Sequence, residues 1–123
     1  MGKRVVVTGL GVVSAIGTGW QDFWGALIRG KSGISEISSF ATSDFNNHLG
    51  GEVKDFTPEK FIDRENISRY GRASALAIAA GKLSLNDSGL DLEKTDLKKI
   101  GVCLGRTMGE SQVLRWLNQS LVK

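Results

Sequence analysis

Few residues of this 123-residue sequence are suited to metal, disulfide or membrane chemistry. With one cysteine and one histidine, the chain cannot form an internal disulfide or a His/Cys-rich metal site. No apolar run approaches the ~20 residues that a membrane helix needs, and no signal-peptide cleavage pattern follows the amino terminus. We therefore expect no metal, no membrane span and, from the cysteine usage, a cytoplasmic protein.

The sequence also has no large excess of charge of either sign. The 16 basic and 13 acidic residues give a net charge of +3, and the basic residues are scattered along the chain. This distribution does not resemble that of a nucleic-acid-binding protein, so we expect no nucleic-acid partner. The hydrophobic content of 41% is ordinary for a globular protein, and the length allows at most one domain.

The most informative stretch lies near the amino terminus, where Val5–Val7 is followed by Gly9 and Gly11. An unbroken β-branched run predicts a strand buried on both faces of a parallel sheet. The glycines allow the backbone to turn sharply or to approach another element closely. A second such strand is predicted at Ile100–Leu104, and it leads into the turn Gly105–Gly109.

Helical patterns lie between the two predicted strands. Thr18 and Gln21 suggest a capping box before a first helix, and Gly30 is placed to end that helix in a left-handed conformation. Its apolar stripe consists of Trp20, Phe23, Trp24, Leu27 and Ile28. The alanine-rich stretch 67–85 predicts one long buried helix, and Thr57–Pro58 predicts another helix start. The alternation indicates an α/β protein with a mostly parallel sheet.

The glycine turn has two interpretations, of which the first is a dinucleotide-binding fingerprint. That fingerprint needs a third small residue, where this sequence has Ser14, and an acidic residue about 20 positions later at the end of a strand. No such strand is predicted there. A dinucleotide-binding module is therefore the weaker alternative.

The second interpretation is a resemblance. The segment Arg4–Gly17 resembles the amino-terminal signature of type II β-ketoacyl-[acyl-carrier-protein] synthases. The likeness continues, in the same order, through Gly30–Ile34, Gly51–Phe56, Asp87–Leu90 and Ile100–Gly105. It implies that residues 1–123 form the amino-terminal portion of a β-ketoacyl synthase domain, within a thiolase-like layered α/β/α/β/α fold. The implied activity is a decarboxylating condensation of an acyl thioester with malonyl-carrier protein, without a cofactor.

The resemblance also implies that the catalytic residues are missing from this chain. The family's cysteine, two histidines and supporting lysine match positions beyond Lys123. Cys103 does not match the nucleophile motif, and its apolar neighbours predict a buried, inert thiol. His48 matches neither family histidine and is predicted to lie in a solvated loop. We expect the chain alone to be inactive. A non-catalytic partner subunit of the chain-length-factor type is the alternative.

Two binding features of the family do map onto this sequence. Met108 matches an apolar residue that gates the acyl-chain pocket, although Arg106 stands where the family more often has a small residue. Arg64, Arg69 and Arg72 match a basic patch that docks acidic acyl carrier protein. The plainer alternatives are a core methionine and a solvated helix face. The resemblance further implies a homodimeric or heterodimeric parent protein.

Overall fold

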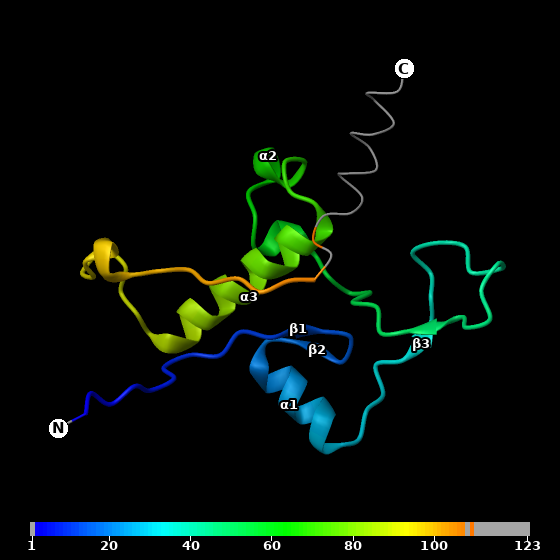
Figure 1. Ribbon diagram of the computed structural model, residues 1–123, viewed down its shortest axis with the longest axis horizontal. Helices are drawn as coiled ribbons and strands as arrows, with labels where there is room; N and C mark the ends of the chain where they lie inside the picture. Colours follow the sequence, from blue (N-terminus) through cyan, green and yellow to red (C-terminus); the bar gives the residue numbers. More distant parts are fainter. Residues whose placement is uncertain (1, 108, 110–123) are drawn as a thin grey trace.

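The computed structural model describes residues 2–107 and 109, and its helices lie around an extended amino-terminal segment (Figure 1). The elements, in chain order, are β1 (Val13–Ser14), β2 (Gly17–Thr18), α1 (Trp20–Ile28), β3 (Ser35–Glu36), β4 (Leu49–Gly50), the 3₁₀ helix η1 (Pro58–Lys60), α2 (Arg64–Ile67), α3 (Arg72–Ser88) and the 3₁₀ helix η2 (Leu97–Lys99). β1 pairs with β2 and β3 with β4, and both pairs are antiparallel.

The two predicted buried strands are wrong for the structure as described. Val5–Val7 and Ile100–Leu104 are extended but lie in no strand, and their side chains are exposed, Val5 to 93% and Val102 to 86%. A strand needs ladder partners and cover on its faces. Neither segment has a ladder partner among residues 2–107 and 109, so the mostly parallel sheet is not formed by this part of the chain.

The glycine segment packs directly against the backbone of α3. A Cβ atom added to Gly9 would lie 2.6 Å from the Ser88 nitrogen, and one added to Gly11 would lie 2.6 Å from the Ser84 nitrogen. Real Cβ atoms do not approach backbone this closely. The close approach predicted for these glycines is therefore confirmed, and what they approach is a helix.

Helix α1 has the predicted end but not the predicted start. Gly19, with φ of 89°, occupies the N-cap position without a side-chain hydrogen bond, so the Thr18 capping box is wrong. The N-cap residue has a positive φ, which glycine adopts freely and threonine only with strain. Gly19 rather than Thr18 therefore occupies the N-cap position. At the other end, Gly30 donates to the Leu27 carbonyl and Lys31 to that of Ala26, the Schellman pattern.

The long helix predicted over 67–85 begins later than predicted, at Arg72, and is preceded by a separate short helix. α2 ends at Ile67, and α3 begins at Arg72 after the extended Gly71, whose ψ of 171° interrupts helical geometry. α3 then continues to Ser88 and ends on Gly89 in the left-handed conformation. The helix start predicted at Thr57–Pro58 is confirmed as the short η1, although Thr57 makes no side-chain cap bond.

The core is small. Only Ala26, Ile62, Ala75 and Ala79 are buried hydrophobic residues in the described part of the chain. Most of the apolar stripe of α1 faces outward, and Trp24 is 56% exposed. Within residues 2–107 and 109, no helix has the length and apolar character needed to cross a membrane. Close backbone packing, rather than large buried side chains, is the main feature of the interior.

We expect Gly11→Ala to destabilise the packing of the amino-terminal segment on α3. The added methyl group meets helix backbone, which cannot move aside as a flexible side chain would, and overpacking of this kind costs about 1–3 kcal/mol. Gly81→Ala is the matched control, because Gly81 lies within α3 with open space around its Cβ position. That change should stabilise the helix by about 1 kcal/mol.

Urea unfolding followed by circular dichroism at the helical band measures both variants. The midpoint should fall for Gly11→Ala and rise for Gly81→Ala. An unchanged midpoint for Gly11→Ala would show that the contact with α3 is not a packing constraint.

Candidate functional site

The side chain of Asp87, near the end of α3, joins three parts of the chain. One carboxylate oxygen accepts a hydrogen bond from the Leu10 backbone nitrogen at 2.8 Å. The other accepts from the Trp20 indole nitrogen, at the start of α1, at 2.7 Å. The backbone of the glycine segment therefore lies against α3. The Leu10 amide, which lies between Gly9 and Gly11, is bonded to the same helix.

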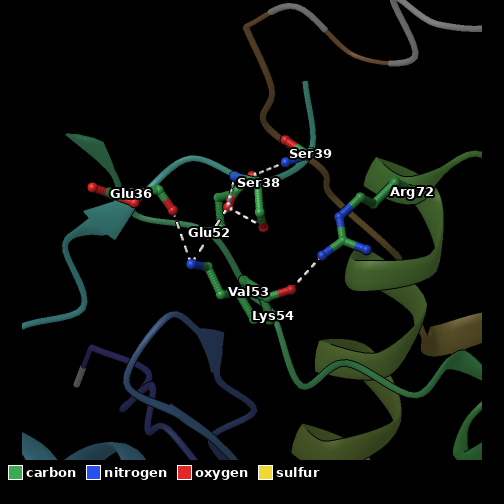
Figure 2. A network of polar contacts seen from close by, with 7 residues as sticks. All are labelled: Glu36, Ser38, Ser39, Glu52, Val53, Lys54 and Arg72. Carbon is green, nitrogen blue, oxygen red and sulfur yellow. Dashed lines mark hydrogen bonds and ion pairs between the residues drawn. The ribbon is translucent and has the colours of Figure 1, made fainter. Parts of the chain in front are cut away.

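A second carboxylate, Glu52, organises the segment after β3 (Figure 2). It accepts hydrogen bonds from the Ser38 nitrogen at 2.8 Å, the Ser38 hydroxyl at 3.0 Å and the Ser39 nitrogen at 3.0 Å. The Ser39 side chain, followed by the Ser38 amide, lowers the pKa of Glu52 from 4.5 to about 2. Donors aimed at a carboxylate favour its charged form, so Glu52 remains an anion at any ordinary pH.

The same cluster continues to the start of α3. Lys54 donates to the Glu36 carbonyl at 2.9 Å and lies 3.9 Å from the Glu52 carboxylate. Arg72, the first residue of α3, donates to the Val53 carbonyl. The backbone around residue 53 therefore connects β3 to α3, and Figure 2 shows Arg72 reaching across from the helix.

The three predicted docking arginines have different environments. Arg64 begins α2 and Arg69 lies in the connection to α3, and both are exposed. No side-chain hydrogen bond or ion pair joins either of them to another described residue. The Arg72 guanidinium is already engaged with Val53. The structure thus leaves the side chains of Arg64 and Arg69 available to a partner and assigns Arg72 a structural contact.

A cavity of about 520 Å³ lies between the β1–β2 turn, α1 and the segments 31–35 and 52–55. Its charged lining residues are Asp22, Arg29, Lys31, Glu52, Lys54 and Asp55. Cations and carboxylates are balanced, and neither Cys nor His is among the described residues that line it. The residues that line this cavity therefore include no thiol and histidine that could form a nucleophile and base pair.

The structure describes two of the remaining sequence candidates, Cys103 and His48, and corrects the prediction for Cys103. Cys103 is an exposed free thiol, so its predicted burial is wrong, because the segment that carries it has no covering strand or helix among the described residues. His48 is exposed, as predicted, and its Nδ1 lies 3.0 Å from the Thr42 hydroxyl. Met108 lies outside the described residues. Within residues 2–107 and 109, no group of three His, Cys, Asp or Glu could hold a metal ion.

Sequence reasoning missed both organising carboxylates. Asp87 opens the segment Asp87–Leu90, and Glu52 lies within Gly51–Phe56, so each stood inside a segment that carried the family resemblance. Their partners lie 77 and 67 positions away for Asp87, and 14 and 13 for Glu52. Position within those segments was the only available signal.

Comparison with known proteins identifies the family. The family model described as "Beta-ketoacyl synthase, N-terminal domain" matches residues 2–122. The chain belongs to this family. The match includes the glycine segment, whose backbone lies against α3, so the synthase interpretation of that segment replaces the dinucleotide-binding one.

Several relatives are 3-oxoacyl-[acyl-carrier-protein] synthase 2 enzymes. The chain is 41% identical to the Synechocystis sp. enzyme over 112 residues, covering 91% of this chain and 27% of the relative. It is 34% identical to the Vibrio cholerae enzyme over 121 residues, covering 98% and 29%. The chain therefore spans little more than a quarter of the length of these relatives.

A solved structure described as "The ishigamide ketosynthase/chain length factor" has a similar fold. The TM-score is 0.76 at 34% sequence identity, and the match covers 95% of this chain and 29% of that one. The thiolase-like fold class inferred from the sequence thus agrees with a solved neighbour.

The Glu52 network has a measurable pH dependence. Because the pKa of Glu52 in the folded chain is about 2, below its ordinary 4.5, its stabilising effect is complete above pH 4.5 and is lost as the pH falls toward 2.

We expect the Ser38 and Ser39 amide signals to titrate with a midpoint near 2 in NMR spectra. Glu52→Gln should abolish this titration, whereas Glu36→Gln, on the neighbouring strand, should preserve it. A midpoint near 4.5 would contradict the network.

Proposed function

We propose that residues 1–123 serve as the amino-terminal portion of a 3-oxoacyl-[acyl-carrier-protein] synthase. The parent would condense an acyl thioester with malonyl-carrier protein and release carbon dioxide. The observation that carries this proposal is the family match over residues 2–122, supported by 41% identity to the Synechocystis enzyme. We also propose a cytoplasmic location, from the cysteine usage, and a dimeric parent, as the resemblance implies.

The chain's own contribution to the reaction is structural in this proposal. Condensation needs a thiolate to carry the acyl group and donors for the developing oxyanion. Among the described residues, the thiol of Cys103 has no histidine bonded to it, and His48 instead lies beside Thr42. We therefore propose that the chain alone does not catalyse condensation, and that its role is to hold the amino-terminal strands and α3 in place.

A subunit of the chain-length-factor type is the second candidate. The similar solved structure is described as both a ketosynthase and a chain length factor, and this likeness favours keeping the candidate. Such a subunit would share these amino-terminal segments and lack the nucleophilic cysteine. The two candidates differ in whether the parent protein carries a cysteine in the family's nucleophile motif.

A chimera tests the proposal. The 112 matched residues of this chain replace their counterparts in the Synechocystis enzyme, and malonyl-dependent condensation is measured with acyl-carrier-protein substrates. We expect activity within about tenfold of the unmodified enzyme, equivalent to ~1.4 kcal/mol in the barrier. The 123-residue chain alone should give none. A folded chimera without condensation would reject the synthase role.

Carrier-protein docking is the second part of the proposal, and it rests on Arg64 and Arg69. Both are exposed, with side chains that no described residue engages. An acidic partner would be steered to them mainly through its association rate, and salt would screen the effect. Met108 remains our proposal for a residue of the acyl pocket, on the resemblance alone.

In the chimera, we expect Arg64→Glu with Arg69→Glu to slow association of acyl carrier protein by about tenfold at low salt, because the steering charge is reversed. The difference should shrink at high salt. Lys98→Glu is the control, since Lys98 is also an exposed cation but lies on η2. Equal association rates for the double variant and the control would exclude the docking role.

A further inference from the structure

The cavity beside α1 has the size and the composition of a site for a small ligand. Its volume of about 520 Å³ lies within the range of roughly 300–1,000 Å³ that is typical of such sites. The half-buried β1–β2 turn and the buried Ala26 form part of its lining, and Ile34 and Val53 add further apolar surface. Charged side chains line the same cavity, so apolar and ionic groups are available to one ligand.

The walls of this cavity are fixed by close packing at two glycines. A Cβ atom added to Gly17 would lie 2.7 Å from the Phe23 nitrogen, so β2 packs directly against α1. One added to Gly33 would lie 2.8 Å from the Ala15 Cβ, so the segment 31–35 packs against the β1–β2 turn. Pairing of β3 with β4 holds the remaining wall, which follows β4 in the chain. The shape of the cavity therefore does not depend on a bound ligand.

Four of the six charged residues that line the cavity have no partner within residues 2–107 and 109. Glu52 already accepts from Ser38 and Ser39, and Lys54 donates to the Glu36 carbonyl. The other four are exposed and make no side-chain hydrogen bond or ion pair with a described residue: Asp22, Arg29, Lys31 and Asp55. The available charges are thus two cations and two carboxylates.

The balance of these four charges indicates the chemistry of the ligand. An anion attracted to Arg29 and Lys31 would also meet two carboxylates, and a cation attracted to Asp22 and Asp55 would meet two basic groups. A ligand with one charge gains little in either case, because attraction and repulsion oppose each other. A zwitterion instead places each of its charges beside the opposite pair.

Arg29 and Asp22 show that this pairing is left open within the chain. The Arg29 Nη1 lies 3.3 Å from the position that a Cβ atom of Gly25 would take, so the side chain folds back along α1. Residues 22 and 25 are three apart and share one face of the helix. The guanidinium is therefore turned toward the carboxylate of its own helix, yet the two groups form no ion pair in the described part of the chain.

We propose that this cavity binds a small zwitterion of the amino-acid class. Asp22 and Asp55 attract its ammonium group, and Arg29 and Lys31 attract its carboxylate. The apolar lining contacts the short chain between the two charges. This binding site is separate from the proposed condensation, and its test does not depend on that activity.

NMR titration of the 123-residue chain with 6-aminohexanoate tests the proposal. We expect saturable shifts of the Gly17 and Gly33 amides with a Kd of about 1 mM, because contacts between exposed charges are weak. Hexanoate and hexylamine keep the chain and one charge of the probe, and each should bind at least about fivefold more weakly. The Gly89 amide, at the end of α3, should not shift with any of the three.

Charge-removing variants separate the two halves of the site. Asp22→Asn should weaken the binding of 6-aminohexanoate about fivefold and strengthen that of hexanoate, because a like charge has been removed. Arg29→Gln should weaken the binding of the zwitterion equally and strengthen that of hexylamine. Glu93→Gln and Lys98→Gln are the matched controls, since both residues are exposed and neither lines the cavity. The controls should bind all three probes as the unmodified chain does.

Three results would overturn the proposal. The first is binding of hexanoate or hexylamine as tight as that of 6-aminohexanoate, which would indicate a site for a single charge or for the apolar chain alone. The second is the absence of saturable shifts at Gly17 and Gly33 in a chain that keeps its helical circular-dichroism signal. The third is the loss of that helical signal from the unmodified chain, because the walls of the cavity are then not formed.

Discussion

The structure depends on a backbone-to-backbone contact between a glycine segment and a helix. At Gly9 and Gly11 the chain approaches α3 so closely that a methyl group would overlap the nitrogens of Ser88 and Ser84. Asp87 closes the contact by accepting from Leu10, and it accepts from Trp20 as well. The amino-terminal segment, α1 and α3 are therefore held together with very little buried apolar side chain.

The opposite end of α3 is held by a second polar cluster. Arg72 donates to the Val53 carbonyl, and the adjacent Glu52, whose pKa is depressed, accepts hydrogen bonds that fix Ser38 and Ser39. α3 is thus anchored near both ends, at Arg72 and at Asp87, by hydrogen bonds to distant segments. These polar contacts join segments that are far apart in the chain, although few of the described residues are buried.

Sequence reasoning succeeded where the signal was local. The Schellman end of α1 at Gly30 and the helix start at Pro58 follow from residues within one turn of each other. The family was identified from segments whose order could be read directly. Sequence reasoning failed where the structure of a segment depended on distant partners, as for the unpaired Val5–Val7 and the exposed Cys103. A buried strand is a property of its neighbours, which the described residues do not supply.

The candidate site shows the same division. The docking role of the three arginines is still a prediction. The engagement of Arg72 with Val53 joins positions 19 residues apart and could not be foreseen from the sequence. The cavity beside α1 likewise collects residues from well-separated segments. Such contacts are determined by packing, so a linear pattern does not show which side chains are already engaged.

The central claim, that one carboxylate joins the glycine segment and α1 to α3, is tested most directly by NMR of Asp87→Ala. The account predicts that the Leu10 amide and the Trp20 indole N–H both lose their hydrogen-bonded shifts and exchange faster, because both donate to Asp87. Signals of Ser38 and Ser39, which depend on Glu52, should remain unchanged. If Leu10 and Trp20 respond separately, or not at all, the claim is contradicted.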